Sequence, residues 1–205
     1  MSETITLHDE HRDDEGSKLG MWLFIFTELL LFGGLFIVYS VYRYRNPVAF
    51  HLAAHELNKT IGIINTVILL VSSMTIAMST TSIQKKAKRT TLILIGITIV
   101  LALVFLVNKY FEWKVKIGHD LYPGSSLLED LGQGDTLFYG LYFFMTGLHA
   151  LHVMAGMIVL TTTIFLVRHG SVRAVNAAIL FNAGLYWHFV DVIWIYLFPL
   201  LYLIT

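Results

Sequence analysis

Five long apolar segments, separated by short segments that hold nearly all of the charge, dominate the sequence. They cover residues 19–42, 61–83, 91–113, 137–167 and 174–204. Each reaches the length of about 20 residues that an α-helix needs to cross the hydrocarbon core of a bilayer. The last two are longer, so their helices are expected to tilt or to project beyond the hydrocarbon. The pattern predicts an all-α fold, an integral membrane bundle of five transmembrane helices.

The composition agrees with a membrane protein. Of the 205 residues, 56% are hydrophobic and only 14% are charged, and the mean hydropathy is +0.69. A soluble domain usually carries closer to about 25% charged residues. The formal net charge is zero, so the charge does not indicate a nucleic-acid partner. Because the chain has no cysteine, disulfides, thiolate metal sites and c-type haem attachment are excluded.

The first eighteen residues, MSETITLHDEHRDDEGSK, are acidic and hydrophilic. They lack the basic start and apolar core of a signal peptide and the Arg-rich character of a transit peptide. We therefore expect residues 1–18 to form an acidic N-terminal tail and residues 19–205 to form the transmembrane domain, with the first apolar segment kept as an anchor.

The positions of Lys and Arg beside the spans predict the orientation. The sharpest basic cluster is QKKAKRT, in the turn between the second and third spans, and Arg168 and Arg173 fall on the same side. The opposite side carries Arg43, Arg45, Lys59, Lys114 and Lys116. Short basic loops stay in the cytoplasm. The N-terminus is therefore expected in the cytoplasm and the C-terminus outside.

Two further patterns predict helix packing. The segment RYRNPVAFHLAAHELNKT (43–60) predicts a short helix in the membrane interface, with one apolar face made of Phe50, Ala53, Ala54 and Leu57. The second span has small polar residues at intervals of seven, namely Asn65, Ser72 and Ser79. Such a stripe lets helices approach closely and hydrogen-bond across their contact.

Glu28, in FTELLLFGGLF, falls near the middle of the first span, where an ionisable side chain is costly to insert. No basic residue lies one turn away on the same helix. Desolvation disfavours the charged carboxylate, so the acid could be neutral and donate a hydrogen bond. Two interpretations stay open: a protonated acid that ties two helices together, or a proton-handling or lipid-binding group.

His149 and His152, in GLHALHV, are three residues apart and share a face of the fourth span. Two imidazoles could join a metal site, but haem or copper would need further ligands. His188 is the only other histidine clearly inside a span, and the paired Glu-x-x-His motifs of di-iron proteins do not occur. Hydrogen bonding between helices is therefore favoured, and no metal ligand is predicted.

In the last span, Trp187, Asp191 and Trp194 fall at i, i+4 and i+7, and His188 precedes Asp191 by three residues. This spacing predicts a self-contained polar cluster, in which the imidazole contacts the carboxylate and indole N–H groups flank it. Such a cluster would serve as a structural contact within lipid.

Glu112, near the end of the third span, has Lys109 at i−3 and Lys116 at i+4. This arrangement predicts an ordinary interfacial ion pair. Because no nucleophile elbow, phosphate loop or zinc-protease motif occurs, no catalytic residue is predicted.

These motifs are similar to those of one family. The final span, YWHFVDVIWIYLFPLLYL, resembles the closing helix of subunit III of haem–copper respiratory oxidases, which reads Trp-His-Phe-(Val/Leu)-Asp-Val-(Val/Ile)-Trp. The segment FFMTGLHALHVMAG resembles the family's Thr-Gly-x-His-Gly-x-His-Val-x-x-Gly, with Ala150 in place of the usual glycine. FTELLLFGGLF resembles its Ser-Glu-x-x-x-Phe helix, which puts Glu28 at the family's membrane glutamate, and Glu112 matches the glutamate that commonly ends the next helix but one.

The resemblance implies a non-catalytic subunit III of a proton-pumping terminal oxidase, a cytochrome c oxidase of aerobic respiration in a bacterial inner membrane. Haem and copper would lie in the partner, the catalytic subunit I. This chain would stabilise that subunit, bind phospholipid, and support oxygen access and proton uptake. Glu28 would be the buried acid near a lipid cleft, and His149, His152, His188 and Asp191 would form the polar core. Long members have seven helices, so another subunit or lipid must cover the surface that the absent first two would occupy.

Alternatives remain at this point. Five-helix members also occur in quinol oxidases and as accessory proteins related to nitric oxide reductases. A small proton channel or transporter, from a different class, would use Glu28 and Asp191 as relay groups, although no inverted repeat supports it. A membrane metalloenzyme would use His149, His152 and His188.

Overall fold

The computed structural model describes residues 14–170 and 177–203, and the regular elements in these ranges are helices. In chain order they are α1 (Asp14–Arg45), α2 (Pro47–His55), α3 (Lys59–Gln84), α4 (Lys88–Gly118), α5 (Ser126–Leu131), α6 (Gln133–His169), α7 (Ala178–Phe198) and the π-helix η1 (Pro199–Leu203). Within the described ranges, five helices are long and apolar enough to cross a membrane, which confirms the predicted five-span bundle. Residues 1–13 of the predicted tail and residues 174–176 and 204 of the predicted last span lie outside these ranges, and α1 begins inside that tail, at Asp14.

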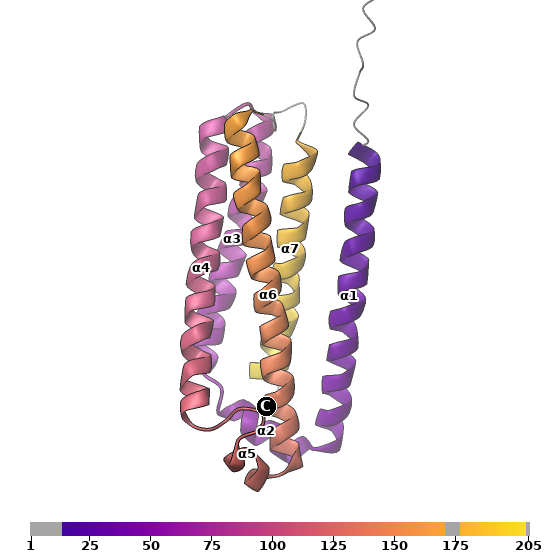
Figure 1. Cartoon of the computed structure of the whole chain (residues 1–205), viewed down its shortest axis with the longest axis vertical. Coiled ribbons are helices and arrows are strands. Elements are labelled where there is room, and N and C mark those ends of the chain that lie inside the picture. Colours follow the sequence, from indigo (N-terminus) through magenta and orange to yellow (C-terminus); the bar gives the residue numbers. More distant parts are fainter. Residues whose placement is uncertain (1–13, 171–176, 204–205) are drawn as a thin grey trace, which may run out of the picture.

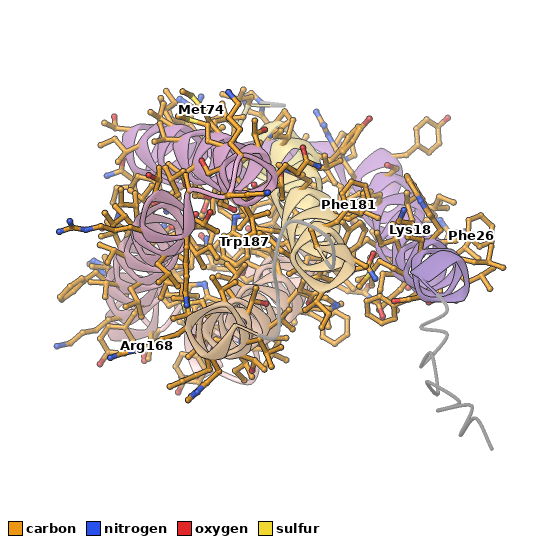
Figure 2. All side chains as sticks on the ribbon, turned by 90° about the horizontal axis from the view of Figure 1, so that it is seen from above. Lys18, Phe26, Met74, Arg168, Phe181 and Trp187 are labelled. Atoms are coloured by element: carbon orange, nitrogen blue, oxygen red, sulfur yellow. The ribbon has the colours of Figure 1, made fainter. Side chains whose placement is uncertain are left out.

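Helices α3, α4, α6 and α7 pack around one core, and α1 lies at one side of it (Figure 1). Seen along the bundle, Trp187 of α7 points into the middle of the packed helices, whereas Phe26 of α1 points away from them (Figure 2). Apart from a minor contact with α2, helix α1 touches the rest of the chain through α6 and α7. Its outer side exposes Trp22, Leu23 and Phe26, as a surface in contact with lipid or another protein would.

The short helices α2 and α5 lie together at one end of the bundle (Figure 1). The predicted interfacial helix is confirmed, because α2 buries Phe50, Ala53 and Ala54, and Leu57 just beyond it is also buried. At the other end, Nζ of Lys88 donates a hydrogen bond to the carbonyl oxygen of Arg168 over 2.8 Å. The two basic turns therefore lie on the same side, as the sequence predicts. Arg173 is outside the described residues.

The stripe of small polar residues on α3 is confirmed as a packing surface. All three of its members are fully buried: Asn65, Ser72 and Ser79. Helix α3 packs along α4, and the side-chain amide of Asn108 donates to Oδ1 of Asn65 over 2.9 Å. Small polar groups at the contact let the two backbones approach and give the hydrogen bonds no competition from water.

Helix α6 has 37 residues, which makes it about 55 Å long at 1.5 Å per residue. This exceeds the about 30 Å of a hydrocarbon core, so one or both of its ends extend into the headgroup region. Pro199 ends α7 and begins η1, where its missing N–H interrupts the regular hydrogen-bond ladder.

Candidate functional site

Glu28 of α1 and His152 of α6 form a hydrogen-bonded pair, 3.0 Å apart between Oε2 and Nε2. The two side chains are largely covered, with exposed fractions of 17% and 15%. The ring of Phe32, one turn along α1, packs edge-on against the imidazole. The acid therefore has a basic partner that its own helix does not provide, and the pair joins the peripheral helix to the bundle.

The backbone determines how protons are distributed in this pair. Nδ1 of His152 lies 2.8 Å from the carbonyl oxygen of Leu148. A carbonyl only accepts, so Nδ1 carries a proton. Nε2 then either accepts from a protonated Glu28 or, in the imidazolium, donates to its carboxylate. In both cases one proton lies between the two groups and forms the hydrogen bond that joins α1 to α6.

His149 does not share a site with His152, although the two are three residues apart. Its side chain is fully buried between the rings of Phe105 and Trp194, with ring centroids 5.6 and 5.3 Å away. Neither ring nitrogen has a hydrogen-bond partner among the described residues. The favoured interpretation, hydrogen bonding between helices, therefore holds for His152 but not for His149. Within residues 14–170 and 177–203, no group of three or more potential ligands could hold a metal ion.

The polar side chains of α7 bond across to α3 rather than to each other. The indole N–H of Trp187 donates to Oγ of Ser72 over 3.1 Å, and Nδ1 of His188 lies 2.6 Å from Oγ of Ser73. About two turns after Trp187, the indole N–H of Trp194 donates to Oγ1 of Thr66 over 3.1 Å. Small hydroxyl residues on α3 thus form hydrogen bonds with the large polar rings of α7.

The predicted self-contained cluster around Asp191 is therefore wrong in its contacts. Asp191 is buried, with an exposed fraction of 3%, and neither carboxylate oxygen has a hydrogen-bond partner among the described residues. Neighbouring side chains on one helix diverge radially, so His188 and both indoles find closer partners on the facing helix. Spacing along one helix could not predict this result, because it leaves out the neighbour.

Glu112 lies in a buried network, not in an ordinary interfacial pair. The predicted ion pair with Lys109 is present, with Nζ 3.1 Å from Oε2, but both side chains are buried. Lys109 also donates to the hydroxyls of Tyr142 (3.1 Å) and Tyr202 (2.7 Å), and both hydroxyls donate to Oε1 of Glu112. Lys116, the other predicted partner, instead donates to the carbonyl oxygen of Glu56.

This network links α4, α6 and η1 through one buried cation and one buried anion. Sequence reasoning missed both tyrosines. The signal that could have found them is depth, because each tyrosine lies near the same end of its span as Glu112. A buried ion pair is stable only when its remaining donors and acceptors are also satisfied, and the two hydroxyls supply those partners.

The model of one protein family, cytochrome c oxidase subunit III, matches residues 1–205. The chain belongs to this family. Curated subunit III proteins align with this chain over most of their length. Cytochrome c oxidase subunit 3 of Thermostichus vulcanus is 32% identical over 98% of this chain and 94% of its own. The probable quinol oxidase subunit 3 of Staphylococcus saprophyticus is 29% identical over 95% of this chain and 93% of its own.

A third relative is named as a fusion of two subunits. The haem–copper oxidase subunit I+III of Aeropyrum pernix is 34% identical over 91% of this chain, which spans only 22% of that longer protein. The family match confirms the prediction of a haem–copper oxidase subunit III and of a multi-pass membrane protein.

In this subunit III chain, the glycine that closes the motif GLHALHVMAG is Gly156. A Cβ atom there would lie 2.8 Å from both Cε3 and Cζ3 of Trp187. The indole thus occupies the space that a side chain would need. The motif of α6 and the tryptophan of α7 meet by close packing, which places the Trp187 N–H against Ser72.

Proposed function

We propose that the chain is the non-catalytic subunit III of a proton-pumping terminal oxidase in aerobic respiration, where it binds and stabilises the catalytic subunit I. The observation that carries this proposal is the buried network of Lys109, Glu112, Tyr142 and Tyr202. Its polar groups bond one another across three helical elements, which is the arrangement of a rigid scaffold and not of an open reaction site.

The family match and the fused subunit I+III relative support subunit I as the partner. Haem and copper are assigned to that partner, so electron transfer and oxygen reduction take place outside this chain. The exposed apolar side of α1, with Trp22, Leu23 and Phe26, offers a surface for subunit I, for lipid, or for both.

Glu28 and His152 support a role in proton uptake and lipid contact. The pair shares one proton and remains about one-sixth exposed on the side of the bundle where α1 packs. The chain also binds phospholipid and supports oxygen access in this proposal. The remaining polar residues of α6 and α7 have a structural role: His149, Trp187, His188, Asp191 and Trp194.

The chain is proposed to lie in the bacterial inner membrane with its N-terminus in the cytoplasm and its C-terminus outside. The basic turns at one end of the bundle support this orientation. The acidic tail of residues 1–18 would then be cytoplasmic. A cysteine introduced in the turn around Lys86 should be labelled by a membrane-impermeant thiol reagent only after the cells are opened.

Affinity purification of the tagged chain from its native membrane tests the function. The expected result is a complex with a reduced-minus-oxidised haem spectrum, while the chain expressed alone carries neither haem nor copper. Stoichiometric haem or copper in the isolated chain, or failure to co-purify with any haem protein, would overturn the proposal. pH-dependent proton flux in liposomes that contain this chain alone would support a channel instead. Comparing reduced cytochrome c with a quinol as substrate of the complex identifies the electron donor.

A further inference from the structure

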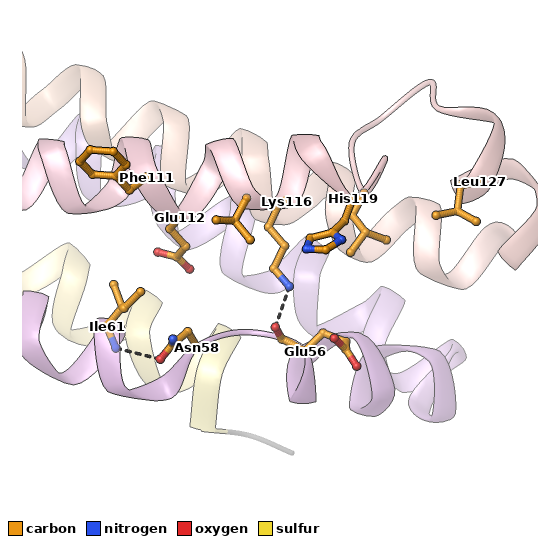
Figure 3. A pocket seen from close by; sticks show the side chains of 10 residues that line it. Glu56, Asn58, Ile61, Phe111, Glu112, Lys116, His119 and Leu127 are labelled. Carbon is orange, nitrogen blue, oxygen red and sulfur yellow. Dashed lines mark hydrogen bonds between the residues drawn. The ribbon is translucent and has the colours of Figure 1, made fainter.

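A pocket of about 480 Å³ opens at the end of the bundle where α2 and α5 lie, between α4 and the start of α3 (Figure 3). It is separate from the Glu28–His152 pair and from the α3–α7 contacts. Polar groups and apolar side chains both line it. The lining residues that matter below are Glu56, Asn58, Phe111, Lys116, His119 and Leu127.

Lys116 is the centre of this pocket. Its side chain is 7% exposed, and its Nζ donates to the carbonyl oxygen of Glu56 over 2.6 Å. An ammonium has three N–H donors, and its Nζ makes no second hydrogen bond among the described residues. A buried charge is costly unless it is paired and hydrogen-bonded. Two N–H donors of the ammonium are thus available to an acceptor in the pocket.

The neighbouring side chains leave these two N–H donors without a hydrogen-bond acceptor. The carboxylate of Glu112 already accepts from Lys109, Tyr142 and Tyr202. The Asn58 side-chain oxygen accepts from the backbone N–H of Ile61, so the Asn58 amide N–H₂ is left over as a donor. His119 lies beside Lys116 (Figure 3). The pocket therefore presents unpaired N–H donors, which a ligand with hydrogen-bond acceptors would satisfy.

The depth and the walls of the pocket indicate what carries that acceptor. Lys116 lies two residues before the end of the 31-residue α4, which is about 46 Å long and so extends past the hydrocarbon core. Phe111 and Leu127, which also line the pocket, are exposed apolar side chains. The pocket thus has a cationic end at headgroup level and apolar walls beside it.

We propose that this pocket binds the headgroup of one membrane phospholipid. Phosphate oxygens accept from Lys116, with Asn58 and His119 as further donors, and an acyl chain lies along Phe111 and Leu127. The carboxylate of Glu56 at the rim balances the charge of Lys116, so a zwitterionic headgroup with an ammonium, such as ethanolamine, fits better than one with added negative charge. The inference rests on the lipid-binding part of the proposed function and names a site for it.

Native mass spectrometry of the full chain, delipidated and then titrated with phosphatidylethanolamine, tests this site. Lys116→Met should weaken the binding of one lipid by about tenfold, since one charge-assisted hydrogen-bonding partner is lost. Lys114→Met is the matched control, because Lys114 is exposed on the same turn and does not line the pocket. It should bind as the unchanged chain does. Inorganic phosphate alone should not bind.

Equal lipid binding by the Lys116→Met and Lys114→Met variants would overturn the inference, as would inorganic phosphate binding as tightly as the lipid. Leu127→Trp keeps the buried cation and fills the pocket, so it should also lose the lipid even if Lys116→Met proves unstable. Retention of the lipid by Leu127→Trp would contradict the site. Co-purification of the haem subunit with each variant is measured separately. A variant chain that still co-purifies with the haem subunit would leave the proposed function intact even if the lipid site is disproved.

Discussion

Glu28 on α1 and His152 on α6 are 124 residues apart in the sequence, yet their side chains lie 3.0 Å from each other. The contact anchors a helix that otherwise meets the bundle mainly through apolar packing on α6 and α7. Because Leu148 holds the Nδ1 proton of His152, the second ring nitrogen must share one proton with the acid. The pair is therefore a structural contact between two helices that depends on one shared proton.

Replacing Glu28 by two different residues separates these roles. Glu28→Gln keeps a donor for Nε2 of neutral His152, so the stability of the complex should change by less than about 1 kcal/mol. The variant can no longer exchange the proton, so activity should decline faster over many turnovers. Glu28→Leu leaves Nε2 of His152 without a partner and should increase hydrogen exchange in α1. Loss of the chain from the purified complex in the Gln variant would contradict this assignment.

The Lys109–Glu112 pair predicts strong coupling between two substitutions. Lys109→Met leaves the buried Glu112 carboxylate uncompensated, and Glu112→Gln leaves a buried cation, so each should destabilise by about 3–5 kcal/mol. The double variant removes both charges and should recover part of the loss. Unfolding of the chain in mixed micelles measures all three. If the two single effects simply add, the network does not act as a unit.

Asp191 and Ser73 should differ in how much stability a conservative substitution costs. Asp191→Asn keeps the size of a side chain that has no hydrogen-bond partner among the described residues, so the amount of assembled complex should stay near the unchanged level. Ser73→Ala removes the partner of His188 and should cost about 1 kcal/mol. Thermal stability of the purified complex checks both. A larger loss of thermal stability in Asp191→Asn than in Ser73→Ala would support the polar cluster that the sequence predicted.

Two glycines on α6 offer a matched pair for the packing of Trp187. Gly156→Ala brings a methyl group into the indole ring and should destabilise by about 1–3 kcal/mol. Gly140→Ala adds the same atom where nothing lies within 4 Å, so it should be neutral or stabilise by up to about 1 kcal/mol. The thermal unfolding of the two variants is compared. Equal stability would mean that the Trp187 indole shifts to accommodate the methyl group at little cost.

The amino-acid sequence by itself determined the five spans, the interfacial helix and the packing stripe on α3. These features depend on hydropathy and periodicity within one segment, and burial of Ser72 and Phe50 follows directly from them. The family motifs around His152 and Trp187 were also readable without any structure.

Tertiary structure alone decided which polar groups meet. The partners of His188 and Trp187 lie on α3, 115 residues away in the sequence, and Tyr202 reaches Glu112 from the far end of the chain. Spacing on one helix predicts only which side chains share a face. The rotation and depth of each helix against its neighbours select the partner, because within lipid a polar group must be satisfied by whichever helix presents a donor or acceptor at the same level.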